Sequence, residues 1–486
     1  MNLSIFVYEI IKSFFSFLPI LIPLGALIFL FIPSRKVLFL FIFFLGFQAI
    51  FIDIGVMVNI PRALLFITLL TIPIYFTREL IIALKGYPAK KMLIVVIFFL
   101  AISALLNIPS FPIKNILTAY GPIGDSLFRD RATKQASQIL MFILKASIPL
   151  VILTICRTRK EVVVMLKVLM AGTSFLCLYG IYQFFAYLFN LPAIYIYRGA
   201  FNPTGAVGIF STPFGNFFRV SSLAGEPKDL AGILLPVSIL LAVITWRVVK
   251  EKHYNLNLKL VLLGLFFLNT CVFVATFSTA GWLGALVGIG GIFIFSMNFQ
   301  PKIRTVWIFC SICLGLMAMY VVIPSVNDVV NKRIIERLNY EYLLNNNEYG
   351  VPQLLHMYKT HPETIIYGAS LGGAVFYEQY NEQPESIVYY LFDYGVIGII
   401  LLFSFFLLVL RKILNISKSD NFKKDILLSG LVYTMVGSIV ATLVFPKVDS
   451  MLGLWVIIGL TTALTISSKE GIESTKDDRS FSAESY

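Results

Sequence analysis

Two short stretches of this sequence hold most of the side chains that could do chemistry, and the first is 218–232, FRVSSLAGEPKDLAG. It contains four charged residues of both signs: Arg219, Glu226, Lys228 and Asp229. An apolar run follows directly and a proline bars a helix upstream, so we expect Asp229 to cap a helix N-terminus. The free N–H groups of that terminus, flanked by Arg219 and Lys228, can bind an anion. The alternative is a salt bridge between Arg219 and Glu226, and the local features leave both interpretations open.

The second stretch is 381–398, NEQPESIVYYLFDYGVIG, which leads into another apolar run. Glu385, Tyr389 and Asp393 follow one another at four-residue steps, which places them along one face of a helix. A carboxylate at the rim of a membrane segment can act as a general base, and an ionisable residue inside one is a functional candidate. For Asp393 an alternative of equal weight is a structural ion pair with Lys145, which lies inside a different apolar run.

Two further groups of candidates lie between these stretches. The segment NKRIIERL at 331–338 places Arg333 and Arg337 on one face of a helix, although such runs more often form solvated amphipathic helices on a membrane surface. The segment THPETIIYGASLGG at 360–373 places His361 before a proline and several glycines, which indicate a turn. Both groups become site candidates only if the chain folds them toward the two stretches above.

The elements that position these residues are membrane-spanning helices. Of the 486 residues, 58% are hydrophobic and 13% are charged, whereas about a quarter are charged in ordinary soluble domains. The mean hydropathy is +0.85. Apolar runs of spanning length recur along the chain, and their continuity favours helices over barrel strands. Spans are expected near 14–33, 37–55, 61–82, 92–108, 138–156, 162–189, 230–250, 258–277, 280–297, 305–324, 386–410, 426–445 and 450–467. The composition therefore predicts an all-α polytopic membrane protein with about thirteen spans (twelve to fourteen).

The distribution of cations orients the predicted spans. Alternate connections are short and basic, namely 34–36, 85–91, 157–161, 247–259, 298–304 and 411–424, and the positive-inside rule assigns them to the cytoplasm. The longer outer connections are then about 109–137, 191–229 and 325–385, and the last two are the largest. Residues 1–467 are expected to form one integral membrane domain without a cleaved signal peptide, and the polar segment 468–486 is expected to be a disordered cytoplasmic tail.

Several function classes are disfavoured by the same residues. The net charge of +13 lies largely in the short cytoplasmic loops, where it serves topology and meets anionic lipid, so no nucleic-acid partner is expected. Cys310 and Cys313 stand alone on an apolar run, and no phosphate-binding loop or metalloprotease signature occurs. We expect neither a metal nor a cofactor. Because the inner loops are short, any substrate is expected to approach from the outer side.

The order of these features resembles the O-antigen polymerase and O-antigen ligase superfamily, best over about 175–410. RVSSLAGEPKDLAGILLP resembles the Arg, Gly and acidic-Pro segment that enters a span, and FSTAGWLGALVG resembles a small-residue helix opening. HPETIIYGASLGG resembles the His-Pro-Gly turn, and PESIVYYLFDYGVIGIILL resembles the return of the large loop to the membrane. Two positions depart from the family: Ser278–Thr279 replaces a common Ser-Arg, and Pro384–Glu385 replaces the His-Asn pair of ligases. The second departure favours a polymerase.

The resemblance implies a glycosyltransferase of GT-C-like architecture in the inner membrane of a bacterium, with its active face toward the periplasm. A sugar hydroxyl on one undecaprenyl-pyrophosphate-linked repeat unit would attack the anomeric carbon of the growing chain and release undecaprenyl pyrophosphate. Arg219 would bind the pyrophosphate with Arg198, Arg337 or Arg333 as helpers, and Glu385, or else His361, would serve as the base. A polysaccharide copolymerase that regulates chain length is an expected partner.

Two rival functions remain at this point. A ligase would transfer the finished glycan to a lipid or protein acceptor. A flippase for lipid-linked oligosaccharides would place functional charges and broken helices near the midplane, often in repeated halves. In this sequence the charges gather in the outer loops, the two longest outer loops differ, and no internal repeat is evident. These features favour the polymerase.

Overall fold

The computed structural model describes most of the helical part of the chain. The described residues are 34–48, 51–53, 57–107, 131–189, 191, 196–197, 200–201, 209–212, 215–297, 351–371, 387–417, 425–445 and 452–481. The predicted spans near 14–33 and 305–324 lie outside the described residues.

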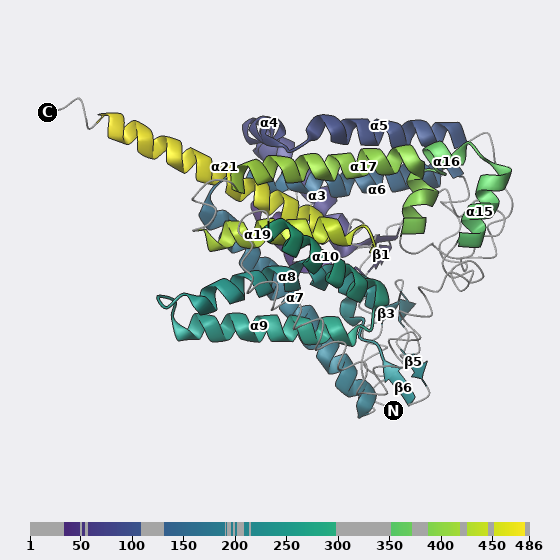
Figure 1. Cartoon of the computed structure of the whole chain (residues 1–486), viewed down its shortest axis with the longest axis horizontal. Coiled ribbons are helices and arrows are strands. Elements are labelled where there is room, and N and C mark those ends of the chain that lie inside the picture. The colour runs from purple at the N-terminus through teal and green to yellow at the C-terminus, as the bar shows by residue number, and fades with distance from the viewer. Residues whose placement is uncertain are drawn as a thin grey trace.

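Long apolar helices dominate the described part of the protein (Figure 1). Five of them have the length and composition to cross a membrane: Gln138–Ile155 within α6 (Arg131–Ile155), α7 (Arg159–Leu188), α8 (Pro227–Lys250), α9 (Leu256–Ala275), and Tyr390–Ile413 within α17 (Ile387–Ser417). Three shorter apolar helices accompany them: Ala280–Ile294 within α10 (Thr279–Met297), α19 (Ile426–Ala441), and Leu452–Ser467 within α21 (Leu452–Phe481). The chain is therefore a helical membrane protein, and the count of thirteen spans stays a prediction.

The predicted span 61–82 is broken into two helices, α3 (Ile60–Tyr75) and α4 (Thr77–Gly86), which meet at 111°. Pro73 lies inside α3 and cannot donate a backbone hydrogen bond, which weakens the last turn of that helix. Phe76 then leaves the helical region with φ −136° and ψ 35°. The pair together could make a sixth crossing, so the span at 61–82 stays a prediction.

The predicted span 37–55 also ends early. The helix α2 (Ser34–Phe43) passes into a 3-10 turn and then into a short hairpin of β1 (Phe51–Asp53) and β2 (Met57–Asn59). The prediction failed because the residues after Gly46 are rich in aromatic and β-branched side chains and are interrupted by Gln48, Asp53 and Gly55, a composition that suits short strands as well as a buried helix. The helix α5 (Lys90–Asn107), by contrast, matches the predicted span 92–108 closely.

Two more hairpins occupy the predicted connection 191–229. They pair β3 (Ile196–Tyr197) with β4 (Ala200–Phe201), and β5 (Ile209–Thr212) with β6 (Gly215–Phe218). Figure 1 shows these strands at the end of the bundle where α7 stops and α8 and α10 begin. We call this the strand end, and the opposite end, where α7 and α9 begin, the basic end.

The middle of the bundle is formed by α8, α19 and α21. Within its apolar window α8 is 67% buried, whereas α9 is 17% buried and so lies at the periphery. Trp455 of α21 is almost fully buried and its ring packs against Phe405 and Phe406 of α17 and Phe142 of α6. Helices from both halves of the sequence therefore share one core.

The polar segment 468–486 was predicted to be a disordered cytoplasmic tail. The backbone of α21 continues as a helix to Phe481 and projects beyond the rest of the bundle (Figure 1). Extending an existing helix requires no new nucleation, which is the unfavourable step of helix formation. The buried apolar half of α21 therefore supplies the nucleus for its polar half.

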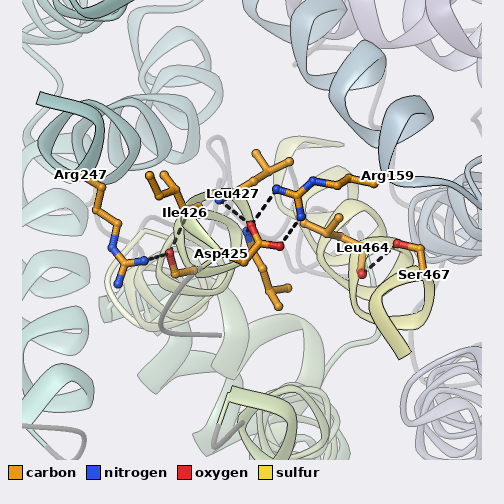
Figure 2. A network of polar contacts seen from close by, with 9 residues as sticks. Arg159, Arg247, Asp425, Ile426, Leu427, Leu464 and Ser467 are labelled. Carbon is orange, nitrogen blue, oxygen red and sulfur yellow. Dashed lines mark hydrogen bonds and ion pairs between the residues drawn. The ribbon is translucent and has the colours of Figure 1, made fainter. Parts of the chain in front are cut away.

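Ion pairs join the helices at the basic end. Arg159 at the start of α7 makes a bidentate pair with Asp425, and the Nη2–Oδ1 distance is 3.0 Å (Figure 2). Asp425 also caps α19 by accepting from two of its backbone N–H groups, at 3.0 and 3.1 Å. Glu161 completes a capping box with Thr158 and pairs with Arg35 of α2. The start of α7 is thereby tied to both α2 and α19.

Candidate anion site at the start of α8

The first turn of α8 differs in detail from the sequence expectation. Glu226 occupies the N-cap position and Pro227 the first helical position, so Asp229 lies inside the first turn and is not the cap. The prediction of Asp229 as the N-cap was wrong because Pro227 fits the first helical position, where its missing N–H goes unused. Glu226 pairs with Lys228, with 3.2 Å between Oε2 and Nζ. The carboxylate of Asp229 still lies where the helix dipole favours negative charge.

The backbone before α8 is irregular, and it is buried. Ser222 has φ 51° and Gly225 has φ 96°, both in the left-handed region. Gln183 of α7 accepts a hydrogen bond from the Ser222 N–H at 2.8 Å, and the Ser222 hydroxyl donates to the Leu176 carbonyl at 2.7 Å. Such backbone is tolerated at membrane depth only where protein groups satisfy it. Gln183 is a residue that sequence reasoning missed, and its signal was a lone amide in the apolar run 162–189.

Arg219 lies beside the C-terminus of α9. Its Nε–H donates to the Thr276 carbonyl at 3.3 Å, and the next residue, Val220, donates its backbone N–H to Ala275 at 3.0 Å. A cation at a helix C-terminus satisfies an unpaired carbonyl and complements the helix dipole. The side chain is half-buried, so this bond holds the guanidinium at a fixed position on the strand end.

A second helix N-terminus lies next to that of α8. The Ser278 hydroxyl accepts from the Gly281 N–H at 3.2 Å and so caps α10. A Cβ added to Gly281 would lie 2.8 Å from the Cβ of Ala231, which shows how closely the first turns of α10 and α8 pack. Two helix dipoles therefore present their positive ends at one place.

Arg62 is a cation of this region that was not among the predicted site residues. Asn59 caps α3 by accepting from the Arg62 N–H at 3.1 Å, so Arg62 belongs to the first turn of that helix. Its side chain is half-buried and interacts electrostatically with Asp229 of α8. The available signal was the string NIPR, an N-cap and a proline followed by an arginine at a helix start.

We call the charged residues of this region the α8 cluster: Arg62, Arg219, Glu226, Lys228 and Asp229. Three cations and two carboxylates leave one net positive charge, and two helix N-termini add to it. Arginine offers a planar fork of donors that matches the geometry of phosphate oxygens. The cluster can therefore bind a phosphate or carboxylate group.

A second group of predicted site residues, which includes His361 and Asp393, lies on the two segments that meet at a contact between two glycines. His361 follows α15 (Val351–Thr360), and its half-buried ring lies 3.5 Å from Glu363, measured from Nδ1 to Oε1. Gly368 follows the short helix α16 (Thr364–Tyr367) and contacts Gly395, where α17 is interrupted. The two glycines have φ 69° and 59°. We call this contact the glycine crossing.

The glycine crossing interrupts the helix that carries Asp393, which was expected to be continuous. Asp393 is 4% exposed and lies two residues before Gly395, in the turns of α17 that leave the axis of the rest of the helix (Figure 1). Tyr389 lies one turn earlier in the same part of α17. Tyr389 and Asp393 lie on one helical segment, and the common face of Glu385, Tyr389 and Asp393 stays a prediction. The pairing of Asp393 with Lys145 stays a prediction.

Polar side chains from α5 and α6 fix the backbone of the glycine crossing. Ser103 donates to the Tyr367 carbonyl at 2.8 Å, and the Gln135 amide donates to the Ala369 carbonyl at 3.0 Å. Burial raises the pKa of the nearby Tyr358 phenol to about 12, and this hydroxyl donates weakly to the backbone of α17. Gln135 was missed because 109–137 was predicted to be a loop, whereas α6 begins at Arg131.

Four of the predicted site residues lie outside the described residues: Arg198, Arg333, Arg337 and Glu385. Their proximity to the α8 cluster or to His361 therefore stays a prediction. Within the described ranges, no three side chains of His, Cys, Asp or Glu gather closely enough to hold a metal ion.

No protein-family model matches the chain, and no curated protein sequence matches it.

Proposed function

We propose that this protein is a glycosyltransferase that joins undecaprenyl-pyrophosphate-linked oligosaccharide repeat units, as the resemblance to O-antigen polymerases implies. One observation supports the proposal: Arg219 and Lys228 lie near the first turns of α8 and α10 at one end of a membrane-embedded bundle, and Arg62 of α3 interacts electrostatically with Asp229 in the first turn of α8. A substrate with a polyprenyl tail and a pyrophosphate head needs apolar surface and fixed positive charge next to each other. The described helices and the α8 cluster offer both.

The proposed reaction needs two things from the side chains: positive charge for the leaving group and a base for the attacking hydroxyl. A sugar hydroxyl of the incoming unit forms a new C–O bond at the anomeric carbon of the growing chain, and the bond from that carbon to the pyrophosphate oxygen breaks. The departing pyrophosphate gains negative charge, which Arg219 and the helix N-termini stabilise. The hydroxyl proton passes to a base, for which Glu385 is the first candidate and His361 the second. Arg198, Arg333 and Arg337 are proposed helpers.

The finer parts of this proposal rest on the sequence. They are the thirteen spans, the bacterial inner membrane, the periplasmic active face and a copolymerase partner. If they hold, the strand end is the periplasmic end, because the basic connections then lie at the opposite end of the bundle.

The test is replacement of Arg219 in a host that lacks its own polymerase, with surface glycan examined by gel. Removing a charged hydrogen-bond donor from an anion removes about 1.5–3 kcal/mol, so Arg219→Ala is expected to lower polymerisation roughly 10- to 100-fold. Arg219→Lys keeps the charge but loses the planar fork, and we expect an intermediate loss. The matched control is Arg411→Ala, which replaces an exposed arginine near the C-terminal end of α17.

Protein level must be measured in the same cells, because Arg219 also holds the Thr276 carbonyl. If the Arg219→Ala protein is present at the normal level and still builds long chains, the proposal is wrong. The gel also separates the rival transferase: loss of a polymerase leaves single repeat units on the acceptor, whereas loss of a ligase leaves none.

A further inference from the structure

The helix α4 leaves the axis of α3 at 111° and is held in that direction at its C-terminus. Lys412 from α17 donates to the Gly86 carbonyl at 3.1 Å, and Lys90 donates to the Leu84 carbonyl at 3.0 Å. Both lysines satisfy carbonyls that a helix C-terminus leaves unpaired. Near the other end, Glu79 lies 3.9 Å from Arg157 of the connection between α6 and α7. A helix of ten residues is thus fixed across the basic end.

The exposed face of α4 mixes apolar side chains with cations. Ile81, Ile82 and Leu84 are 52%, 48% and 44% exposed, whereas Ala83 faces the protein and is buried. At 100° per residue, Arg78 and Lys85 fall between these apolar side chains, on the same side of the helix. A face that meets only water would not expose so much apolar surface, and a face that meets only acyl chains would not carry two cations. The mixture suits the boundary between headgroups and acyl chains.

The cations on this face are distinct from those that have a structural task. Lys90, Lys412 and Arg157 are engaged as just described. Arg78 and Lys85 are exposed and make no hydrogen bond or ion pair with any residue that the structure describes. Glu79 is the one acidic residue between 77 and 91, and it is directed toward Arg157. The face therefore carries unneutralised positive charge.

We infer that α4 is a docking surface for anionic phospholipid headgroups, lying in the plane of the membrane interface. Ile81, Ile82 and Leu84 insert among the first carbons of the acyl chains. Arg78 and Lys85 extend their apolar stems along that layer and place their charges at the phosphates. A lipid surface is the occupant because Arg78 and Lys85 lie side by side with exposed apolar side chains on both flanks, which complements anionic headgroups above acyl chains. This inference is independent of the reaction proposed above.

The test measures the lipid bound to the purified full-length protein by native mass spectrometry. The protein is titrated in detergent with phosphatidylglycerol or with phosphatidylcholine, and bound lipids are counted at each concentration. Each cation near an anionic surface strengthens binding roughly fivefold, so Arg78→Gln with Lys85→Gln is expected to weaken phosphatidylglycerol binding about 25-fold. Phosphatidylcholine binding should stay unchanged.

Two controls make the result specific to α4. Lys252→Gln with Lys259→Gln removes one charge from the α8–α9 connection and one from the first turn of α9, at the same end of the bundle, and should leave phosphatidylglycerol binding unchanged. Arg78→Lys with Lys85→Arg keeps both charges and should retain tight binding, which separates a charge effect from a folding defect.

Three outcomes would overturn the inference. The first is equal binding of the two lipids by the unaltered protein, and the second is loss of binding in the charge-conserving variant. The third is an unchanged lipid count in the Gln variant; a change in its oligomeric state would then make α4 an interface between copies of the chain.

Discussion

Replacing Gly395 by alanine should destabilise the protein more than any exposed substitution, because the glycine crossing has no room for a side chain. A Cβ at Gly395 would lie 2.3 Å from the Gly368 nitrogen and 2.8 Å from the Ile366 carbonyl oxygen. The backbone there has φ 59° and ψ −174°, a region used almost only by glycine and costing about 1–3 kcal/mol for other residues. Forcing an extra carbon into packed backbone costs about 1–3 kcal/mol more.

The expected loss in the free energy of unfolding is therefore about 2–6 kcal/mol, or at least roughly 30-fold in the unfolding equilibrium. Unfolding of the purified protein by sodium dodecyl sulfate, followed by circular dichroism, measures this loss. Gly368→Ala should behave alike, since its Cβ would lie 2.5 Å from the Gly395 nitrogen. The double variant should be less than additive, because both changes open the same contact.

Gly264→Ala on α9 is the matched control. No atom lies within 4 Å of a Cβ built at Gly264, and alanine in a helix is favoured over glycine by roughly 0.5–1 kcal/mol. This variant should equal or exceed the unaltered protein in stability. If Gly395→Ala and Gly264→Ala unfold alike, the two glycines are not in the contact described and the reasoning fails.

Two further predictions concern the basic end. Asp425→Asn removes the charge that pairs with Arg159 but keeps a side chain that can cap α19, whereas Asp425→Ala removes both. The alanine variant should be less stable than the asparagine variant by about 1 kcal/mol in the same unfolding titration. Equal stabilities of the two variants would contradict the capping role. Burial, with a smaller contribution from Glu161, raises the pKa of the Cys156 thiol to about 12, and the side chain is 2% exposed. The thiolate is the reactive form of cysteine. In a variant whose other cysteines are replaced, a water-soluble maleimide at pH 8 should therefore label Cys156 only after denaturation. Labelling of the folded protein at the rate of a free thiol would contradict this prediction.

Much of the helical framework could be predicted from the sequence, because a continuous apolar run of spanning length has few alternatives to a helix. α5, α7, α8 and α9 begin and end within a few residues of the expected spans. The break at Phe76 could not be predicted, since a proline in an apolar run is equally compatible with a kink and with two separate helices. The same limit applies to the hairpin after α2, whose residues suit either structure.

The candidate site was predicted only where its residues are close in sequence. Arg219, Glu226, Lys228 and Asp229 fall in one segment, so their common location followed from the chain itself. The approach of Arg62 to Asp229 depends on how α3 packs near α8, and no local pattern encodes that packing. The glycine crossing is also a tertiary contact, and the glycines of 360–373 indicated only a turn.

The bond between Arg159 and Asp425 has a consequence for how the protein is made. The two residues are 266 positions apart, so at roughly 5–20 residues per second a ribosome needs about 13–53 s to pass from one to the other. α7 and α8 are synthesised early in that interval, when α19 and α21, which fill the middle of the bundle, do not yet exist. The early helices must wait in the membrane with their central faces covered by lipid or by an insertion factor. The core of this protein is therefore completed last, when α19 and α21 enter the middle of the bundle.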